Sequence, residues 1–221
     1  MSNQRIYAIY HAAVDLFLKQ GYSKTQISHI AKAAGVSVGT IYHDFTGKEE
    51  IMHFILKCTL EPDFMDREFE RPITDELFCD LDHEIMEAFE KSQSEFAENI
   101  KNAGESYSFE SLISDTFDFL SRYAVGCLFI EKNQMDCGRL IKYYKEYRKR
   151  FFLTMTAYMN AFIEKGIVRP LEQPELTTSL IIEILSWWAM DMRYISFEAA
   201  EVPYEQAKAV CMDNIISAYK K

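Results

Sequence analysis

Apolar residues recur every three or four positions along most of this chain, which is the spacing of one buried face of an α-helix. Near the N-terminus the pattern is interrupted at short intervals. It predicts four helices within about sixty residues, beginning near positions 5, 25, 37 and 46. Thr25, Ser37 and Thr46 stand at three of these starts, and each hydroxyl can cap a helix N-terminus.

Further along the chain the predicted helices lengthen. The clearest covers 138–166, and another, apolar nearly all round, covers 175–197. A last helix begins near Pro203, and we find no internal repeat. We therefore expect an all-α fold of about nine helices, with a small three-helix head over residues 1–47 and a larger helical bundle over residues 48–221.

Two glycines stand four residues apart in the stretch "AAGVSVGTIYHDF", residues 33–45. A helix, a turn containing Gly35 and a second short helix form the pattern of a helix-turn-helix, whose second helix lies in the DNA major groove. We expect Gly35 to take a left-handed conformation and to let the next helix cross closely. Gly39, near the start of that helix, would let its backbone approach DNA.

The short helix has an inner and an outer face. Ile41 and Phe45, four residues apart, are predicted to point inward. The residues left facing outward, the candidates for reading DNA, are Val38, Thr40, Tyr42 and His43. A threonine hydroxyl can donate or accept, a tyrosine hydroxyl can reach a phosphate, and a valine can touch a thymine methyl.

Other residues are predicted to hold the phosphate backbone. Lys48 stands at the start of the fourth helix, where backbone N–H groups also favour an anion. Thr25 and Gln26 begin the second helix and are candidates for the other wall of the groove. With Ser37 and Gly39 at the start of the short helix, they complete the predicted DNA-binding set.

The stretch "AAVDLFLKQGYSKTQISHIAKAAGVSVGTIYHDFTGKEEI", residues 12–51, closely resembles the DNA-binding region of the TetR/AcrR family of bacterial transcriptional regulators. Two departures stand out. Asp44 occupies a position where the family often has His or Tyr, and we leave it out of the site because a phosphate would repel its charge. Gln26 replaces a frequent Thr, but its amide can also donate to a phosphate.

The resemblance implies a homodimer built from the last two long helices and a small-molecule pocket inside the bundle. The candidate pocket residues, which suit an apolar or aromatic effector, are Phe117, Leu120, Tyr123, Phe151, Met155, Tyr158, Trp187 and Trp188. For each of them alone, a place in the core is favoured over a place in a pocket. The candidate interface residues are Ile181, Leu185, Met192, Ala207, Cys211 and Ile215.

The charge of the chain supports a division into two parts. The net charge of −10 alone would argue against a nucleic-acid partner, yet residues 1–57 carry a net +2 and the remainder −12.

Several other classes of function are disfavoured. The five cysteines are scattered and include no C-x-x-C pair, which indicates reduced thiols in a cytoplasm. No signal peptide or membrane span is expected, because even the most apolar run carries charges. We find no hydrolase, phosphate-loop or metalloprotease motif, and so expect no enzyme activity and no cofactor.

Two patterns have a second interpretation. The run "KYYKEYRKRFF" interleaves basic and aromatic residues, but its spacing favours a solvated helix face over a nucleic-acid or membrane patch. Cys79 and His83 have metal-ligand spacing but no further ligands, so we predict no metal.

We therefore predict a repressor, acting at the bacterial nucleoid, that binds double-stranded DNA as a dimer and is released by a small molecule. The alternatives are an activator with the same head and a DNA-bound interaction protein without an inducer.

Overall fold

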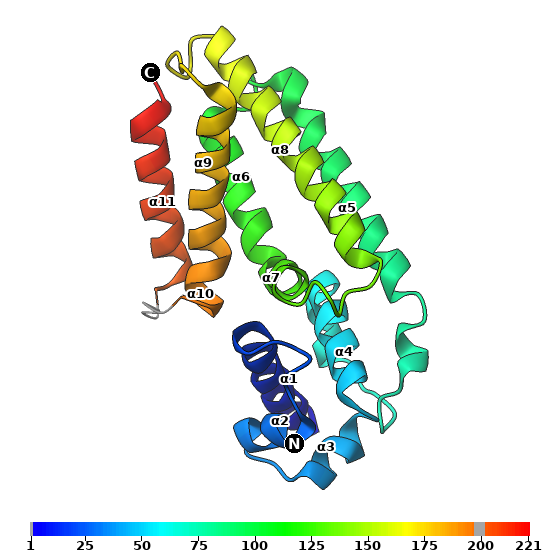
Figure 1. Ribbon diagram of the computed structural model, residues 1–221. Coiled ribbons are helices and arrows are strands. Elements are labelled where there is room, and N and C mark those ends of the chain that lie inside the picture. The colour runs from blue at the N-terminus through cyan, green and yellow to red at the C-terminus, as the bar shows by residue number, and fades with distance from the viewer. Residues whose placement is uncertain (1, 197–201) are drawn as a thin grey trace. The chain divides into compact units, whose positions relative to one another are not determined.

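The computed structural model describes residues 2–196 and 202–221 and confirms the all-α class (Figure 1). This part of the chain holds 10 helices and no strand when the continuous segment from α9 to α10 is counted once. The first four helices are α1 (Ser2–Lys19), α2 (Ile27–Ala34), α3 (Val38–Asp44) and α4 (Lys48–Leu60). The later ones are α5 (Leu81–Glu98), α6 (Phe109–Arg122), α7 (Ala124–Lys132), α8 (Leu140–Glu164), α9 (Pro174–Ser186), α10 (Met192–Tyr194) and α11 (Tyr204–Tyr219). Short 3₁₀ turns η1 (Pro62–Asp66), η2 (Asp75–Phe78) and η3 (Asn99–Asn102) lie between them, and a π-helical turn, η4 (Trp187–Asp191), joins α9 to α10.

The predicted helix starts meet different outcomes. Ser37 does cap α3, because its hydroxyl accepts from the Thr40 backbone N–H at 3.0 Å. The prediction for Thr25 is wrong: Gln26 occupies the N-cap of α2, and the Thr25 hydroxyl instead donates to the Gly21 carbonyl at 2.8 Å. Thr46 is also not the cap of α4, since its hydroxyl bonds the carbonyl of Ile73.

The long C-terminal helices agree with the predicted pattern. α8 occupies the range predicted as 138–166, and Gly166 follows it at a φ of +70°. α9 begins at Pro174, within one residue of the predicted start, whereas the predicted end at residue 197 lies outside the described residues. No described helix combines the length and the apolar character that crossing a bilayer requires.

The chain divides into two compact units. The first comprises Met1–Met86 with Val125–Ile141, and the second Glu87–Ala124 with Lys142–Lys221. The first unit therefore contains the three-helix head together with α4 and most of α7. The functional boundary at residue 47 stays a prediction, because compactness groups the head with these further helices.

In the first unit, Asn133 at the end of α7 is built into the turn between α1 and α2. Its side chain is 4% exposed. Its Oδ1 accepts from the Tyr22 backbone N–H at 2.6 Å, and its Nδ2 donates to the carbonyls of Phe129 at 2.9 Å and Phe17 at 3.4 Å. Ser23 in the same turn donates to Asp136 at 2.6 Å. The head is thus hydrogen-bonded to the segment that follows α7.

In the second unit, most of the predicted pocket residues belong to the core. Phe117, Leu120, Phe151, Met155 and Tyr158 are all buried. Tyr158 donates to the Phe96 carbonyl at 2.5 Å, and Thr116 to the Met155 sulfur at 3.6 Å. Tyr123 and Trp188 are half-buried, and Trp187 is exposed. The five buried residues therefore lie in the core, which we favoured for each residue alone. Phe117 also borders a cavity.

The predicted interface residues also need correction. Ile181, Leu185, Ala207, Cys211 and Ile215 are buried within the single chain, in which α11 packs on α6 and α9. Met192 is half-buried and lines the same cavity as Phe117. The large apolar residues that α9, η4 and α11 leave exposed are Leu176, Leu180, Trp187, Tyr204 and Val210.

Asn133→Ala is expected to lower the free energy of unfolding by about 1–3 kcal/mol, because the Tyr22 N–H loses its acceptor and the Phe17 and Phe129 carbonyls lose the side-chain amide. Urea unfolding followed by circular dichroism measures this loss. Gln134→Ala, at the exposed next position, is the matched control and should change the free energy by less than about 0.5 kcal/mol. Equal stability of both variants would show that the Asn133 hydrogen bonds do not support the turn.

Candidate nucleic-acid interface

The turn between α2 and α3 has the predicted left-handed glycine. Gly35 lies at φ +68°, and its N–H and that of Val36 bond carbonyls of the last turn of α2. A Cβ added at Gly35 would meet no atom within 4 Å, so the backbone conformation, and not a close helix crossing, favours glycine there. A Cβ at Gly39 would meet only the Ser37 hydroxyl, at 3.7 Å. The approach of DNA to Gly39 stays a prediction.

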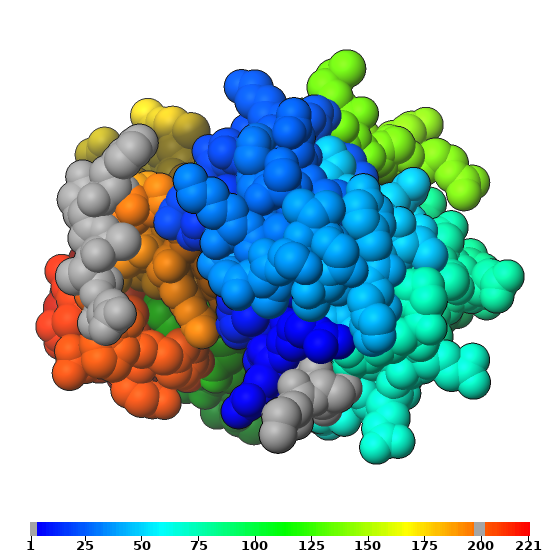
Figure 2. Space-filling model, turned by 90° about the horizontal axis from the view of Figure 1, so that it is seen from below, coloured from blue at the N-terminus to red at the C-terminus, as the bar shows by residue number. Residues whose placement is uncertain are grey.

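The two faces of α3 are arranged as its sequence predicts. Ile41 and Phe45 are buried, with 0% and 1% of their surface exposed. On the opposite side Val38 and Tyr42 are 41% and 51% exposed. Figure 2 shows the blue atoms of α2 and α3 on the face turned to the viewer. α3 thus presents large side chains that nothing in the described chain covers.

The remaining residues of this edge are polar. Ser37, Gly39 and His43 are exposed, and Thr40 is half-buried. The hydroxyls of Ser37 and Thr40 lie 2.8 Å apart, so one of them donates to the other. The accepting hydroxyl keeps its own hydrogen and can donate it to a ligand. The structure therefore brings together the α3 candidates Ser37, Val38, Gly39, Thr40, Tyr42 and His43.

The two residues predicted at the start of α2 differ in exposure. Thr25 is 1% exposed, and besides donating to Gly21 it accepts from Gln20 Nε2 at 3.0 Å. This burial argues against a phosphate contact by the Thr25 side chain. Gln26 is exposed at the N-cap of α2, where its own N–H donates to His29 Nδ1 at 3.3 Å. Gln26 keeps a side chain that can reach a phosphate.

Lys48 has a structural role that the sequence did not indicate. Its ammonium donates to the carbonyls of Tyr22 at 2.8 Å and Thr25 at 3.0 Å, and lies 4.0 Å from the centre of the Tyr22 ring. These contacts join the start of α4 to the turn before α2. An ammonium has three donors, so a phosphate contact through the third stays a prediction.

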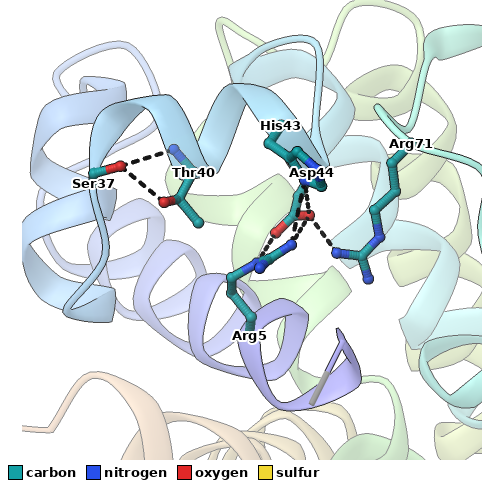
Figure 3. Close-up of polar contacts among 6 residues, drawn as sticks. All are labelled: Arg5, Ser37, Thr40, His43, Asp44 and Arg71. Atoms are coloured by element: carbon teal, nitrogen blue, oxygen red, sulfur yellow. Dashed lines mark hydrogen bonds and ion pairs between the residues drawn. The ribbon is translucent and has the colours of Figure 1, made fainter.

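Asp44, the residue that departs from the family pattern, is completely buried and joins three parts of the first unit (Figure 3). Arg5 of α1 donates to both carboxylate oxygens, at 2.5 and 2.6 Å. Arg71, from the segment after η1, donates to Asp44 Oδ1, and His43 Nδ1 lies 3.0 Å from the same oxygen. The carboxylate is therefore turned away from the exposed edge of α3 and neutralised inside.

The backbone of the same segment reinforces these contacts. The Ile73 N–H donates to the Asp44 carbonyl at 2.8 Å, and the Thr46 N–H donates to the Ile73 carbonyl at 3.1 Å. We call residues 71–73, which hold the end of α3 by these bonds and through Arg71, the clasp. Neither Arg5 nor the clasp was predicted as part of the site, since nothing near α3 in the sequence points to them.

The surroundings of Asp44 shift its acidity. Burial by itself raises the pKa of this carboxyl. Hydrogen bonds from Arg5 and His43, together with the charge of Arg71, lower the pKa by more than burial raises it. The net pKa lies below the usual value for an aspartate, so the carboxylate stays charged throughout the neutral range.

Comparison with known proteins gives matches to parts of the chain. The family model described as "Bacterial regulatory proteins, tetR family" matches residues 9–54. The fatty acid metabolism regulator protein of Bacillus subtilis (strain 168) is 47% identical over 49 residues, which are 22% of this chain and 25% of that protein. The HTH-type transcriptional regulator HbdR of Aromatoleum sp. (strain CIB) is 43% identical over 58 residues, 26% of this chain and 25% of its own. This chain thus matches only about a quarter of the length of these curated relatives.

A solved structure resembles the fold over nearly the whole chain. The ketosteroid transcriptional regulator KstR2 of Mycobacterium tuberculosis aligns with a TM-score of 0.56 over 98% of this chain and 95% of that one. The sequence identity is 17%, so the likeness concerns the fold alone.

Asp44→Asn is expected to lower the free energy of unfolding near neutral pH by about 3 kcal/mol, because Arg5 and Arg71 lose the carboxylate between them. The contribution of Asp44 to the free energy of unfolding depends on pH. A carboxyl whose pKa is lower in the folded than in the unfolded state stabilises the fold above the unfolded value, about 4. That stabilisation is lost as the pH falls from about 4 through the folded value.

Urea unfolding measured from neutral pH down to about pH 3 tests this expectation. The difference between the natural protein and Asp44→Asn should shrink in the acidic range. Asp63→Asn, at an exposed position of the same unit, is the control and should follow the natural protein. A constant difference at all pH values would contradict the assignment of a depressed pKa to Asp44.

Proposed function

Because residues 9–54 match the model of the tetR family of bacterial regulatory proteins, we propose that this protein regulates transcription by binding an operator in double-stranded DNA. The proposal rests on the exposed edge of α3. Val38 and Tyr42 are exposed there, while Ile41 on the opposite face of the helix is buried. The major groove admits an α-helix, and the edge offers both apolar and hydrogen-bonding groups to the bases. The side-chain amide of Gln26 and the third N–H donor of the Lys48 ammonium contact phosphates.

The protein acts as a homodimer in this proposal. The exposed apolar side chains Leu176, Leu180 and Trp187 follow one another at steps of four and seven residues along α9 and η4, and so share a helix face. Val210 is exposed on α11. A second copy covers these residues in place of the buried ones predicted from the sequence. Two heads roughly 34–36 Å apart then bind a near-palindromic site.

A small effector binds in the second unit. A cavity of about 490 Å³ opens between α6, the segment from η4 to α10, and the start of α11, and Phe117 and Trp188 both line it. This volume lies within the range of about 300–1,000 Å³ that small-molecule sites occupy. The cavity supports a ligand-responsive repressor over an interaction protein without an inducer. The curated matches cover only about a quarter of the chain, so the effector is proposed from the cavity alone.

Effector binding alters DNA binding through helices that run without a break from one unit into the other. α5 and α8 each run from one compact unit into the other, and α7 begins at Ala124 in the second unit. Asn133 then joins the end of α7 to the turn before α2. An effector that favours one arrangement of these helices alters the position of α4 and the separation of the two heads. A coupling free energy of about 1–3 kcal/mol changes operator affinity by up to some hundredfold.

The DNA-binding proposal predicts different effects for two residues of the edge. Thr40→Val should change the sequence preference, because the base that its hydroxyl contacts loses a partner worth about 1–3 kcal/mol. Tyr42→Phe should weaken binding to all sequences alike by removing a phosphate contact. The measurement is fluorescence anisotropy on duplexes selected from genomic DNA and on scrambled duplexes. If Thr40→Val weakens both duplexes equally, α3 does not read bases at this position.

Lys48→Ala separates the two roles of that residue. Loss of a phosphate contact should flatten the dependence of affinity on salt by about one ion. Loss of the bonds to Tyr22 and Thr25 should lower the free energy of unfolding by about 1–3 kcal/mol. A salt slope equal to that of the natural protein, measured well below the unfolding transition, would leave Lys48 with only its structural role.

Leu180→Glu should convert the dimer to a monomer, because it places a charge at the centre of the proposed interface. Sedimentation velocity measures the change. Leu153→Glu is the matched control: Leu153 is a similarly exposed leucine of the same unit, on α8. A natural protein that sediments as a monomer, or a Leu180→Glu variant that remains a dimer, would contradict the proposed interface.

A further inference from the structure

Most side chains that line the effector cavity are apolar, among them Phe117, Trp188, Met192 and Ala207. Ser121 and Tyr204 contribute hydroxyls. Arg193 is the single charged side chain among the described lining residues. A cavity with an apolar wall and one cation suits a ligand with an apolar body and one negative charge.

Among the described residues around the cavity, Arg193 forms no ion pair. Asp118, on α6, is already neutralised: Tyr204 donates to it, and Lys208 donates to its Oδ1 at 2.5 Å. Within the described residues, no carboxylate lies within ion-pair distance of Arg193. Arg193 is exposed, and its guanidinium carbon lies 5.2 Å from the centre of the Tyr194 ring.

The backbone beside the cavity is irregular in a way that points to a site. At η4 the Met192 N–H bonds the carbonyl of Trp187, five residues earlier, and so forms a π-helical turn inside an otherwise α-helical segment. Such turns are rare and occur frequently at functional sites. The turn contains Trp188 and Ala189, both of which line the cavity, and is followed by Met192 and Arg193.

We propose that this cavity binds an apolar carboxylate, with the carboxylate against Arg193 and the apolar body between Trp188, Met192 and Phe117. This inference rests on the proposed function in that it names the class of effector. A guanidinium pairs with a carboxylate through two parallel hydrogen bonds, and the indole and thioether supply the apolar contact.

The experiment uses the Trp187→Phe variant of the 221-residue chain, in which Trp188 is the only tryptophan and its emission reports on the cavity. The probes are phenylhexanoate, phenylhexanol and phenylhexylamine, which share one apolar body and differ in charge. Phenylhexanoate should change Trp188 emission at a concentration at least about tenfold lower than phenylhexanol does. Phenylhexylamine should bind most weakly, since Arg193 repels its ammonium.

Arg193→Gln in the same background should weaken phenylhexanoate binding by about tenfold or more and leave phenylhexanol binding unchanged. Arg122→Gln, which removes an exposed arginine of α6 outside the lining, is the matched control and should retain the preference for the anion. Circular dichroism checks that each variant is folded.

Two outcomes would overturn the inference. Equal binding of phenylhexanoate and phenylhexanol, with no effect of Arg193→Gln, would show an apolar effector site without charge recognition. No change of Trp188 emission with any probe, in protein that still binds its selected duplex, would remove the cavity as the site and leave DNA binding intact. Failure of the proposed function would appear separately, as absence of duplex binding.

Discussion

A helix of seven residues cannot hold its own conformation in water, and α3 is such a helix. Its neighbours must therefore supply its stability, and they do so on every side except one. Ser37 caps its N-terminus, Gly35 sets the turn before it, and Ile41 and Phe45 anchor its inner face. The side left open carries the residues that can meet a DNA base.

The end of α3 shows how the surrounding structure meets this requirement. An aspartate there would repel a phosphate if it faced outward. Asp44 instead points inward, where Arg5 and the clasp neutralise its charge and the clasp backbone bonds the residues that follow. The head consequently depends on a segment beyond α4, in the same way as its first turn depends on Asn133 after α7. DNA-binding geometry and the rest of the first unit are thus physically connected.

Local features of the structure could be predicted from the sequence, and contacts between distant segments could not. The cap at Ser37, the turn at Gly35 and the buried face at Ile41 depend on neighbours a few residues away. The partnership of Asp44 with Arg71 depends on where a distant segment folds back. The apolar character of α9 led us to place Ile181 and Leu185 in a dimer interface, but an apolar pattern does not say what covers a residue. Their cover is the same chain, and the exposed Leu180 is the better interface candidate.

The function proposed for this protein requires the open edge of α3 to lie against duplex DNA. Photocrosslinking tests it most directly, with a benzophenone amino acid placed at position 42 and, for comparison, at the exposed position 153 of α8. Crosslinks to a selected duplex in dilute buffer are expected from position 42, and none are expected from position 153. Absence of any duplex binding, or crosslinks from position 153 but not from position 42, would contradict this expectation.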